Sequence, residues 1–147
     1  MIISSLQKYF ISGAIRPEFI AEAIGNHSSK TDIGAHSIFL GQVRADDHQG
    51  KQVQAIEYEA YTEMAEKMIS NIRETIIPLY SLKCLHIYHS LGKVEVGGIC
   101  LFVFCSAKHR VKAMHACSEI VDRLKTEVPV LGKEIFIDNS TTWKRNQ

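Results

Sequence analysis

The chain has 147 residues, a length typical of one compact domain, and 46% of them are hydrophobic, which is enough for a buried core. Its formal net charge of +1 counts against the broad positive field of a nucleic-acid-binding protein, so any anion site must be local. No apolar run approaches the roughly 18 residues that a membrane span needs, and the N-terminus lacks the pattern of a signal peptide. We therefore predict a single domain over residues 1–147, in the cytoplasm and away from membranes.

The first half of the chain alternates between helical and extended patterns. A proline at the start of residues 17–24 favours the first turn of a short helix. Residues 34–43 predict a strand, and residues 53–61 predict another, because apolar and polar side chains alternate there with a period of two. The segment between them, residues 45–51, is polar and contains glycine, which predicts a mobile loop.

A long helix is expected next, over residues 62–77, because its apolar residues recur at intervals of three and four. Thr62 is the expected N-cap, and Pro78 is expected to stop the helix. Two further strands are predicted over residues 81–91 and 99–105. The connection between these strands is expected to run through three glycines, Gly92, Gly97 and Gly98.

The last third of the chain predicts a second long helix, over residues 107–127, whose apolar face repeats at helical spacing. Ser106 is its expected N-cap and Pro129 its expected end. Residues 135–137 predict a short strand, and Trp143 is expected to dock the tail. Because hairpin-like connections dominate, we predict an α+β fold in which helices pack on a mostly antiparallel sheet.

Three potential cations, Lys108, His109 and Arg110, gather at the start of this second helix. The positive end of the helix dipole lies there, so each positive charge costs roughly a few tenths of a kcal/mol. A bound phosphate or carboxylate would offset this cost, since the N–H groups of the first turn, the dipole and Arg110 all favour an anion. The alternative is that these side chains simply point into water.

Two other positions suit a pocket for an anionic substrate. Arg44 follows Gln42 and Val43 at the end of a predicted strand, and its planar guanidinium can grip an anion with two hydrogen bonds, although arginine is also common on surfaces. Lys125 lies at the edge of the second helix's apolar face, where partial desolvation among cations helps a lysine act as a base or nucleophile. Its spacing alone is more typical of a lysine with a solvated head group.

The remaining titratable residues give weaker patterns. Glu57 and Glu59 share a strand face, which suits acid–base chemistry but is more typical of an exposed polar face. His86 and His89 are an odd number of residues apart on a strand, so they point to opposite faces, and the histidine spacing predicts no metal site. The four cysteines form no C-x-x-C pair and are expected to be buried in a reducing compartment.

Short motifs follow one another in order along most of the chain. They are Gly-Ala at 34–35, Phe-Leu-Gly-Gln-Val-Arg at 39–44, Ile-Glu-Tyr-Glu-Ala-Tyr at 56–61, His-Ser-Leu-Gly at 89–92, Ser-Ala-Lys-His-Arg at 106–110, Asp-Arg-Leu-Lys at 122–125 and Lys-Glu at 133–134. No single motif is decisive, but the ordered set resembles the large subunit of molybdopterin synthase, the MoaE family.

This resemblance implies an α/β hammerhead fold and a homodimer at the centre of a heterotetramer. The implied partner is a small ubiquitin-like sulfur-carrier subunit whose C-terminal Gly-Gly thiocarboxylate enters a pocket of the large subunit. Its sulfur would be delivered to cyclic pyranopterin monophosphate, and two rounds would make the dithiolene of molybdopterin. No metal or organic cofactor is implied, because the carrier brings the sulfur already activated.

The resemblance also assigns roles to residues. Lys125 would be the catalytic lysine beside the thiocarboxylate. The substrate-binding residues would be Gln42, Val43, Arg44, His109, Arg110, Lys125, Gly132, Lys133 and Glu134. Of three departures from the family pattern, one bears on activity. The family usually has Trp-Lys-Lys-Glu where this chain has Leu131-Gly132-Lys133-Glu134, so the first of those lysines aligns with Gly132. Lys133 is then the candidate for a second catalytic lysine.

A second hypothesis stays open beside the sulfurtransferase. The chain could be a non-catalytic dimeric module that binds an anionic metabolite or a partner's C-terminal tail, and the missing lysine at Gly132 favours that alternative. The enzyme hypothesis predicts a partner gene for a small protein ending in Gly-Gly. A nucleic-acid binder is disfavoured by the near-zero net charge and by the absence of an aromatic and basic surface pattern.

Overall fold

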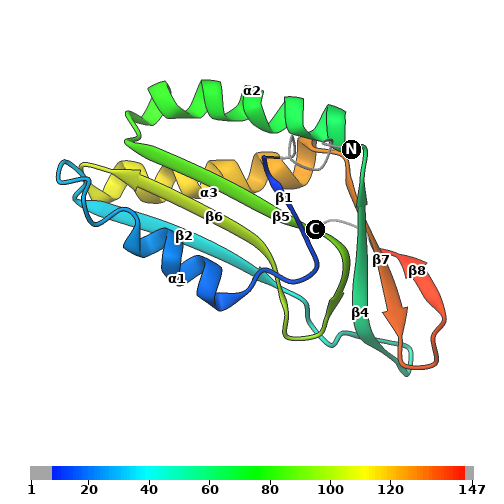
Figure 1. Ribbon diagram of the computed structural model, residues 1–147. Helices are drawn as coiled ribbons and strands as arrows, with labels where there is room; N and C mark the ends of the chain where they lie inside the picture. Colours follow the sequence, from blue (N-terminus) through cyan, green and yellow to red (C-terminus); the bar gives the residue numbers. More distant parts are fainter. Residues whose placement is uncertain (1–7, 145–147) are drawn as a thin grey trace, which may run out of the picture.

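The computed structural model describes residues 8–144, and in this range three helices pack on one eight-stranded sheet (Figure 1). The elements in chain order are β1 (Phe10–Ser12), α1 (Pro17–Gly25), β2 (Ala35–Gln42), β3 (Asp47–His48), β4 (Lys51–Ala60), α2 (Thr62–Tyr80), β5 (Cys84–Glu95), β6 (Ile99–Ala107), α3 (Arg110–Glu127), β7 (Val130–Phe136) and β8 (Thr141–Trp143). The main strand order is β2-β6-β5-β4-β7-β8, and only β1 with β5 pairs in parallel among these strands. The predicted α+β fold is confirmed.

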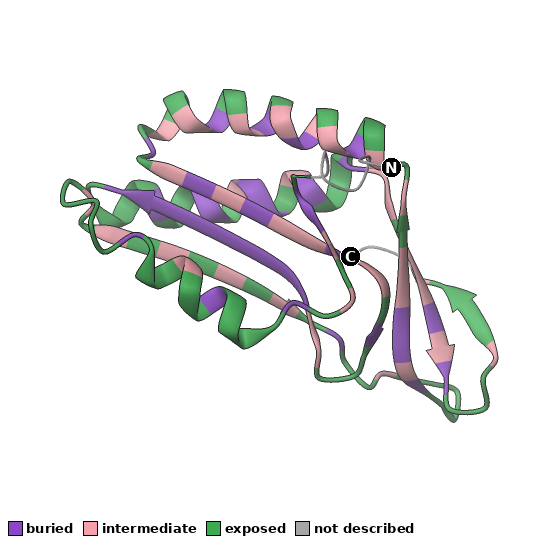
Figure 2. Cartoon of the chain, viewed as in Figure 1, coloured by how far each residue is buried: buried purple, intermediate pink, exposed green. Residues whose placement is uncertain are grey.

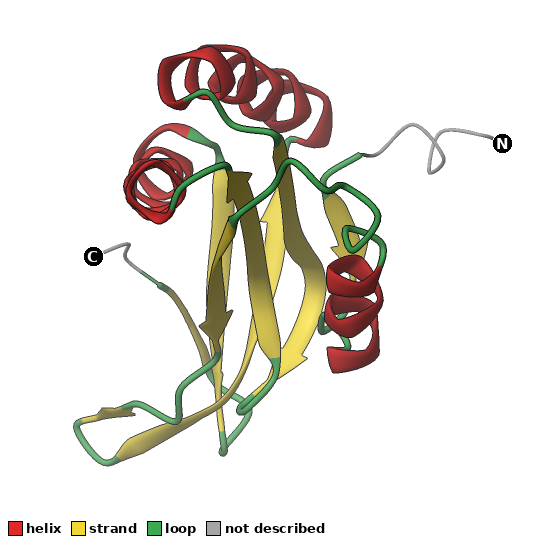
Figure 3. Ribbon diagram, turned by 90° about the vertical axis from the view of Figure 1, so that its left-hand side faces the viewer, coloured by secondary structure: helices red, strands yellow, loops and turns green. Residues whose placement is uncertain are grey.

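Helices α2 and α3 cover one face of the sheet, and α1 covers the other (Figure 3). Ile69 and Ile72 of α2 and Ile120 of α3 are almost completely buried against strand residues such as Leu85 and Val103. Burying an isoleucine of this kind stabilises a fold by about 1.5–3 kcal/mol relative to leaving it exposed. This layer of isoleucines therefore fixes α2 and α3 over the centre of the sheet.

The opposite face has a smaller core beneath α1. Ile20 of α1 and Ile15 before it pack with Phe102 and Phe104 of β6. Strand β6 is therefore buried along nearly its whole length, because helices cover both of its faces, whereas β2 at the sheet edge alternates between half-buried and exposed residues (Figure 2). The continuous apolar run in β6 follows from this double burial.

Strand β5 bends and so divides the sheet into two parts. Residues 84–89 pair with β6, whereas residues 92–95 pair with β4. Gly92 lies at this junction with φ of +84°, a conformation that side chains other than glycine adopt at a cost. As a result, β4, β7 and β8 lean away from the helix-covered part as a separate arm (Figure 1).

Several predicted boundaries were wrong. The chain enters α3 at Arg110 rather than 107, and its N-cap is His109, because Ser106 remains in β6 with its Oγ 2.7 Å from Nδ1 of His36. The N-cap of α2 is Tyr61 rather than Thr62, and Pro78 lies inside the last turn instead of stopping it.

The segment predicted as a mobile loop contains a hairpin. Strands β3 and β4 pair through Asp47 with Gln52 and through His48 with Lys51, and the two turn residues between them have positive φ angles. Sequence patterns also missed β1 and β8, which are only three residues long, and shortened β7. Trp143 lies in β8. No helix in residues 8–144 is long and apolar enough to cross a membrane.

Candidate active site

A pocket of about 530 Å³ opens where the bend of β5 meets the C-terminal end of α3. Its wall combines residues from the end of β2, from β4, β5, β6 and β7, and from α3. The polar and small residues that line it are Gly41, Gln42, Arg44, Asp46, Tyr58, His89, Cys100, Lys125, Gly132, Glu134 and Lys144. The volume lies within the range of about 300–1,000 Å³ that is typical of small-molecule sites.

Arg44 reaches this pocket from the segment after β2. Its Nε atom lies 3.2 Å from Oδ1 of Asp46, and its side chain is 71% exposed. An ion pair exposed to this degree contributes little stability, so the guanidinium can exchange Asp46 for a substrate anion at small cost. Gln42 also lines the pocket, whereas the Val43 side chain is buried in the core of the arm and can act only by positioning its neighbours.

Lys125 projects into the pocket from the last turn of α3, which places a cation at the negative end of the helix dipole. Its charge acts on His89 in β5. Burial lowers the pKa of His89 to about 4, a contact with the backbone carbonyl of Ser90 partly opposes this, and Lys125 lowers the pKa further. His89 is therefore neutral near pH 7. Its Nδ1 lies 2.8 Å from the Ser90 oxygen and donates to it, which leaves Nε2 as an acceptor.

Tyr58 lies against His89, with the two rings 5.0 Å apart in an edge-to-face arrangement. Burial raises the pKa of Tyr58, and the neighbouring Cys100 and Glu134 raise it further. The phenol thus keeps its proton and remains a hydrogen-bond donor in the pocket. Glu134 is only 5% exposed, and the nearest ring nitrogen of His48 lies 3.4 Å from its carboxylate.

Lys133, the predicted second catalytic lysine, does not line the pocket, whereas Lys144 does. Gly132 and Glu134 of β7 line the pocket, and because side chains alternate along a strand, Lys133 between them points the other way. Its Nζ lies 5.5 Å from the centre of the Trp143 ring, a cation–π contact outside the pocket. Lys144 does line the pocket, and its backbone N–H donates to the carbonyl of Gly132 at 2.7 Å.

His109 and Arg110 do not line the pocket of their own chain. They are exposed at the N-terminal end of α3, whereas Lys125 lies near its C-terminal end. Fifteen residues of helix separate Arg110 from Lys125, a span of about 22 Å. A substrate the size of a pterin cannot touch both ends, so one chain brings together only part of the predicted site.

Sequence reasoning missed five pocket residues with polar or thiol side chains, which are His89, Tyr58, Lys144, Asp46 and Cys100. The first two lie within the ordered motifs, at 89–92 and 56–61, but nothing in their spacing shows that they face each other. Asp46, His48 and Glu134 bring possible metal-ligating atoms within 4.8 Å of one another at the rim. Asp46 is however already paired with Arg44.

Comparison with known proteins shows which family the chain belongs to. The family model for the MoaE protein matches residues 15–127, which is most of the chain. The chain belongs to the MoaE family. The match spans the ends of β2 and α3, and therefore both Arg44 and Lys125 of the pocket.

Individual MoaE relatives agree with the family match. A molybdopterin synthase catalytic subunit from Pyrococcus abyssi is 41% identical over 124 residues, which are 84% of this chain and 82% of the relative. The bovine molybdopterin synthase catalytic subunit is 37% identical over 78% of this chain, and the match spans 60% of the bovine protein.

Solved structures show the same MoaE fold. The crystal structure of molybdopterin synthase from Staphylococcus aureus superposes with a TM-score of 0.81 at 29% identity, covering 94% of this chain and 96% of the other. A complex of subunits 1 and 2 of the molybdopterin-converting factor from Helicobacter pylori superposes with a TM-score of 0.79, and its 20% identity supports the fold alone. The hammerhead-type architecture expected from the resemblance is confirmed.

Proposed function

We propose that this chain is the catalytic subunit of a molybdopterin synthase, acting in the cytoplasm. It transfers sulfur from the thiocarboxylated C-terminus of a small ubiquitin-like carrier to cyclic pyranopterin monophosphate. The observation that carries the proposal is Lys125, which projects into a preformed pocket beside the neutral His89 in a chain of the MoaE family. The relatives from Pyrococcus abyssi and cattle are both named molybdopterin synthase catalytic subunits.

The pocket suits the chemistry of this transfer. The thiocarboxylate sulfur displaces an oxygen substituent from a carbon of the pterin substrate and so forms a thioester, and the leaving oxygen takes up a proton. Water then cleaves the thioester, so that the carrier leaves as a carboxylate and the sulfur stays on the pterin as a thiolate. The hydrolysis builds negative charge on the acyl oxygen, which Lys125 stabilises, and Lys125 also gives the proton that the leaving oxygen takes up in the first step. Arg44 at the rim holds the substrate's phosphate, and the protonated Tyr58 donates a hydrogen bond.

The proposal includes the assembly expected from the sequence, a homodimer at the centre of a heterotetramer with two carriers. His109 and Arg110 are too far from Lys125 to share a substrate within one chain, so we assign them to the pocket of the second copy. There they bind the anionic substrate together with Arg44. The Helicobacter pylori structure is itself a complex of two different subunits.

Lys144 takes the place of the lysine that Gly132 lacks. It lines the pocket beside Gly132, to which its backbone is hydrogen-bonded, whereas Lys133 faces Trp143. The pocket therefore holds a second lysine beside Lys125, although position 132 is a glycine. This removes the feature that favoured a non-catalytic binding module.

The test is reconstitution from purified components. The chain is mixed with a thiocarboxylated Gly-Gly carrier and cyclic pyranopterin monophosphate, and molybdopterin is followed through its fluorescent oxidation product. Lys125→Ala is expected to lower turnover by about 100-fold or more while carrier binding persists. Lys133→Ala is the matched control and should retain turnover. A stable complex with the carrier that forms no product would instead establish the binding-module alternative.

A further inference from the structure

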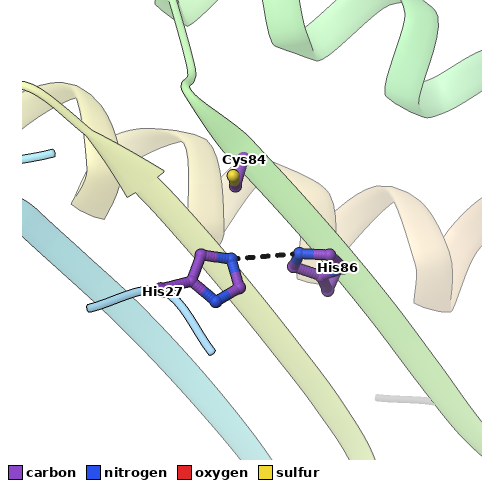
Figure 4. A group of neighbouring side chains, drawn as sticks. All are labelled: His27, Cys84 and His86. Atoms are coloured by element: carbon purple, nitrogen blue, oxygen red, sulfur yellow. Dashed lines mark hydrogen bonds between the residues drawn. The ribbon is translucent and has the colours of Figure 1, made fainter. Parts of the chain in front are cut away.

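A group of metal-ligating side chains lies on the face of the sheet opposite the pocket. His27, in the turn that follows α1, meets Cys84 and His86 at the start of β5 (Figure 4). The nearest ligand atoms of the three, the ring nitrogens and the cysteine sulfur, all lie within 4.8 Å of one another. We propose that His27, Cys84 and His86 form a zinc site with three protein ligands and a fourth position open to water.

The spacing of the three residues suits one ion. Cys84 and His86 are two positions apart on a strand, so both side chains leave the same face of the sheet. The two Nε2 atoms of His27 and His86 lie 3.1 Å apart. Two nitrogens bound to one tetrahedral zinc at 2.0–2.1 Å lie about 3.3 Å apart, so the distance between these two nitrogens needs to change by only a few tenths of an ångström.

The orientation of His27 is fixed by the main chain. Its Nδ1 lies 2.7 Å from the carbonyl oxygen of Ala23 in α1 and donates to it. The proton is therefore on Nδ1, and Nε2, which faces His86, carries a lone pair. Histidine ligands of metals commonly donate their other ring nitrogen to a carbonyl or carboxylate in this way. His27 is 6% exposed and its ring packs on Phe104, which holds it in place.

The donor set also selects the kind of ion. A thiolate with two imidazoles suits zinc, whereas magnesium and calcium require oxygen ligands. Lys30 currently donates to Cys84, with Nζ 3.1 Å from Sγ. Lys30 is exposed, so its ammonium can turn into solvent when a divalent ion takes its place beside the sulfur.

Such a site would tie the turn after α1 to β5, two segments 59 residues apart in the chain. It is separate from the pocket, because His89 and Lys125 lie on the side of the sheet that α2 and α3 cover. The histidine spacing predicted no metal site, because His27 lies far from Cys84 and His86 in the chain and only folding brings them together.

The experiment is a titration of the reduced, metal-free full-length chain with cobalt(II), used as a visible substitute for zinc, followed by competition with zinc. We expect one ion per chain and a sulfur-to-cobalt charge-transfer band in the near ultraviolet. Cys84→Ser should abolish that band, and His86→Ala should weaken the affinity by at least about tenfold. His115→Ala, an exposed histidine of α3, is the matched control and should bind as the wild type does.

A stability measurement keeps the test independent of the spectrum. Zinc should raise the melting temperature of the wild type and of His115→Ala but not that of a Cys84→Ser, His86→Ala double variant, because an ion that binds the folded state stabilises it. Binding without a thiolate band would place the ion elsewhere, at a group such as Asp46, His48 and Glu134, and would overturn the proposal. Binding unchanged in the double variant would overturn it equally.

Discussion

The two ends of helix α3 both carry cations, and they differ in what surrounds them. Lys125 at the C-terminal end lies in a pocket, beside a histidine whose pKa its charge helps to lower. His109 and Arg110 at the N-terminal end are exposed on their own chain. The helix dipole favours a cation at the first end and an anion at the second. The C-terminal end of α3 therefore lies in a preformed pocket, whereas the N-terminal end is an exposed surface at which the dipole favours an anion.

The largest expected effect tests whether the two ends meet across two copies of the chain. Lys125→Ala and Arg110→Ala should each reduce kcat/KM, by about 100-fold and by about 10- to 100-fold respectively. A mixed dimer that carries one substitution on each copy should recover about half of the wild-type turnover, because one of its two pockets keeps both residues. The measurement is the reconstitution assay on dimers purified through two different tags.

The matched control for this test has both substitutions on one copy and none on the other. If Arg110 serves the partner's pocket, each pocket of this dimer lacks one residue and the dimer stays nearly inactive. Equal activity of the two mixed dimers would contradict the assignment of Arg110 to the second copy.

A second prediction concerns stability at the N-terminal end of α3, where the backbone at Gly34 packs closely against the chain. Gly34 precedes β2 and its N–H donates to the carbonyl of Ala107, just before α3. A Cβ at Gly34 would overlap with the backbone carbonyl of Lys108. Gly34→Ala should therefore lower the free energy of unfolding by about 1–3 kcal/mol, as overpacking does. Denaturant unfolding measures this.

Gly25→Ala is the control for that substitution, because a Cβ at Gly25 meets open space at the end of α1. It should leave the free energy of unfolding unchanged or raise it by up to about 1 kcal/mol. If both variants lowered the free energy of unfolding equally, the close contact between Gly34 and the segment before α3 would not be the cause of the loss.

At the other end of the helix, Lys144 should matter more than Lys133. Lys144→Ala should lower turnover by about tenfold, because it removes one of the cations that face the developing negative charge. Adding Gly132→Lys to that variant should restore part of the loss, since the Cβ of a side chain there needs only its nearest neighbour, the Ile56 side chain at 3.2 Å, to move by a few tenths of an ångström. If Lys144→Ala left turnover unchanged, Lys144 would have no part in catalysis, and Lys125 would be the one pocket lysine that contributes to it.

The smallest effect is a pH dependence of stability that originates in the pocket. The pKa of His89 falls from 6.5 to about 4 on folding, so between these values the unfolded chain binds a proton that the folded chain does not. Stability should accordingly decrease as the pH falls from 6.5 to 4. Since His89 is only half-buried, its share is on the order of 1 kcal/mol.

His89→Gln removes that share, so its free energy of unfolding should fall less steeply than that of the wild type over the same pH range. A slope remains, because burial also lowers the pKa values of His36 and His86. Parallel curves for the variant and the wild type would show that His89 titrates alike in the folded and unfolded chain.

Local patterns in the sequence predicted the helices and most of the strands. The spacing of three and four in α2 and the alternation in β4 report directly which face of each element is buried, so both elements were found, with ends displaced by at most three residues. The short strands β1 and β8 carry no such signal, since three residues are too few for a period. Ser106 was misplaced because a good N-cap residue is equally able to sit in a strand and bond to His36.

The fold class and the family could be read from the sequence, because these depend on local periodicity and on the order of motifs. Only the tertiary structure decided which residues share a site. The bend of β5 at Gly92 brings His89 to Lys125, strand alternation turns Lys133 away, and β8 adds Lys144 beside Gly132. On the opposite face, the turn after α1 brings His27 to His86. Such contacts join segments far apart in the chain, and their distances are fixed by packing rather than by any short pattern.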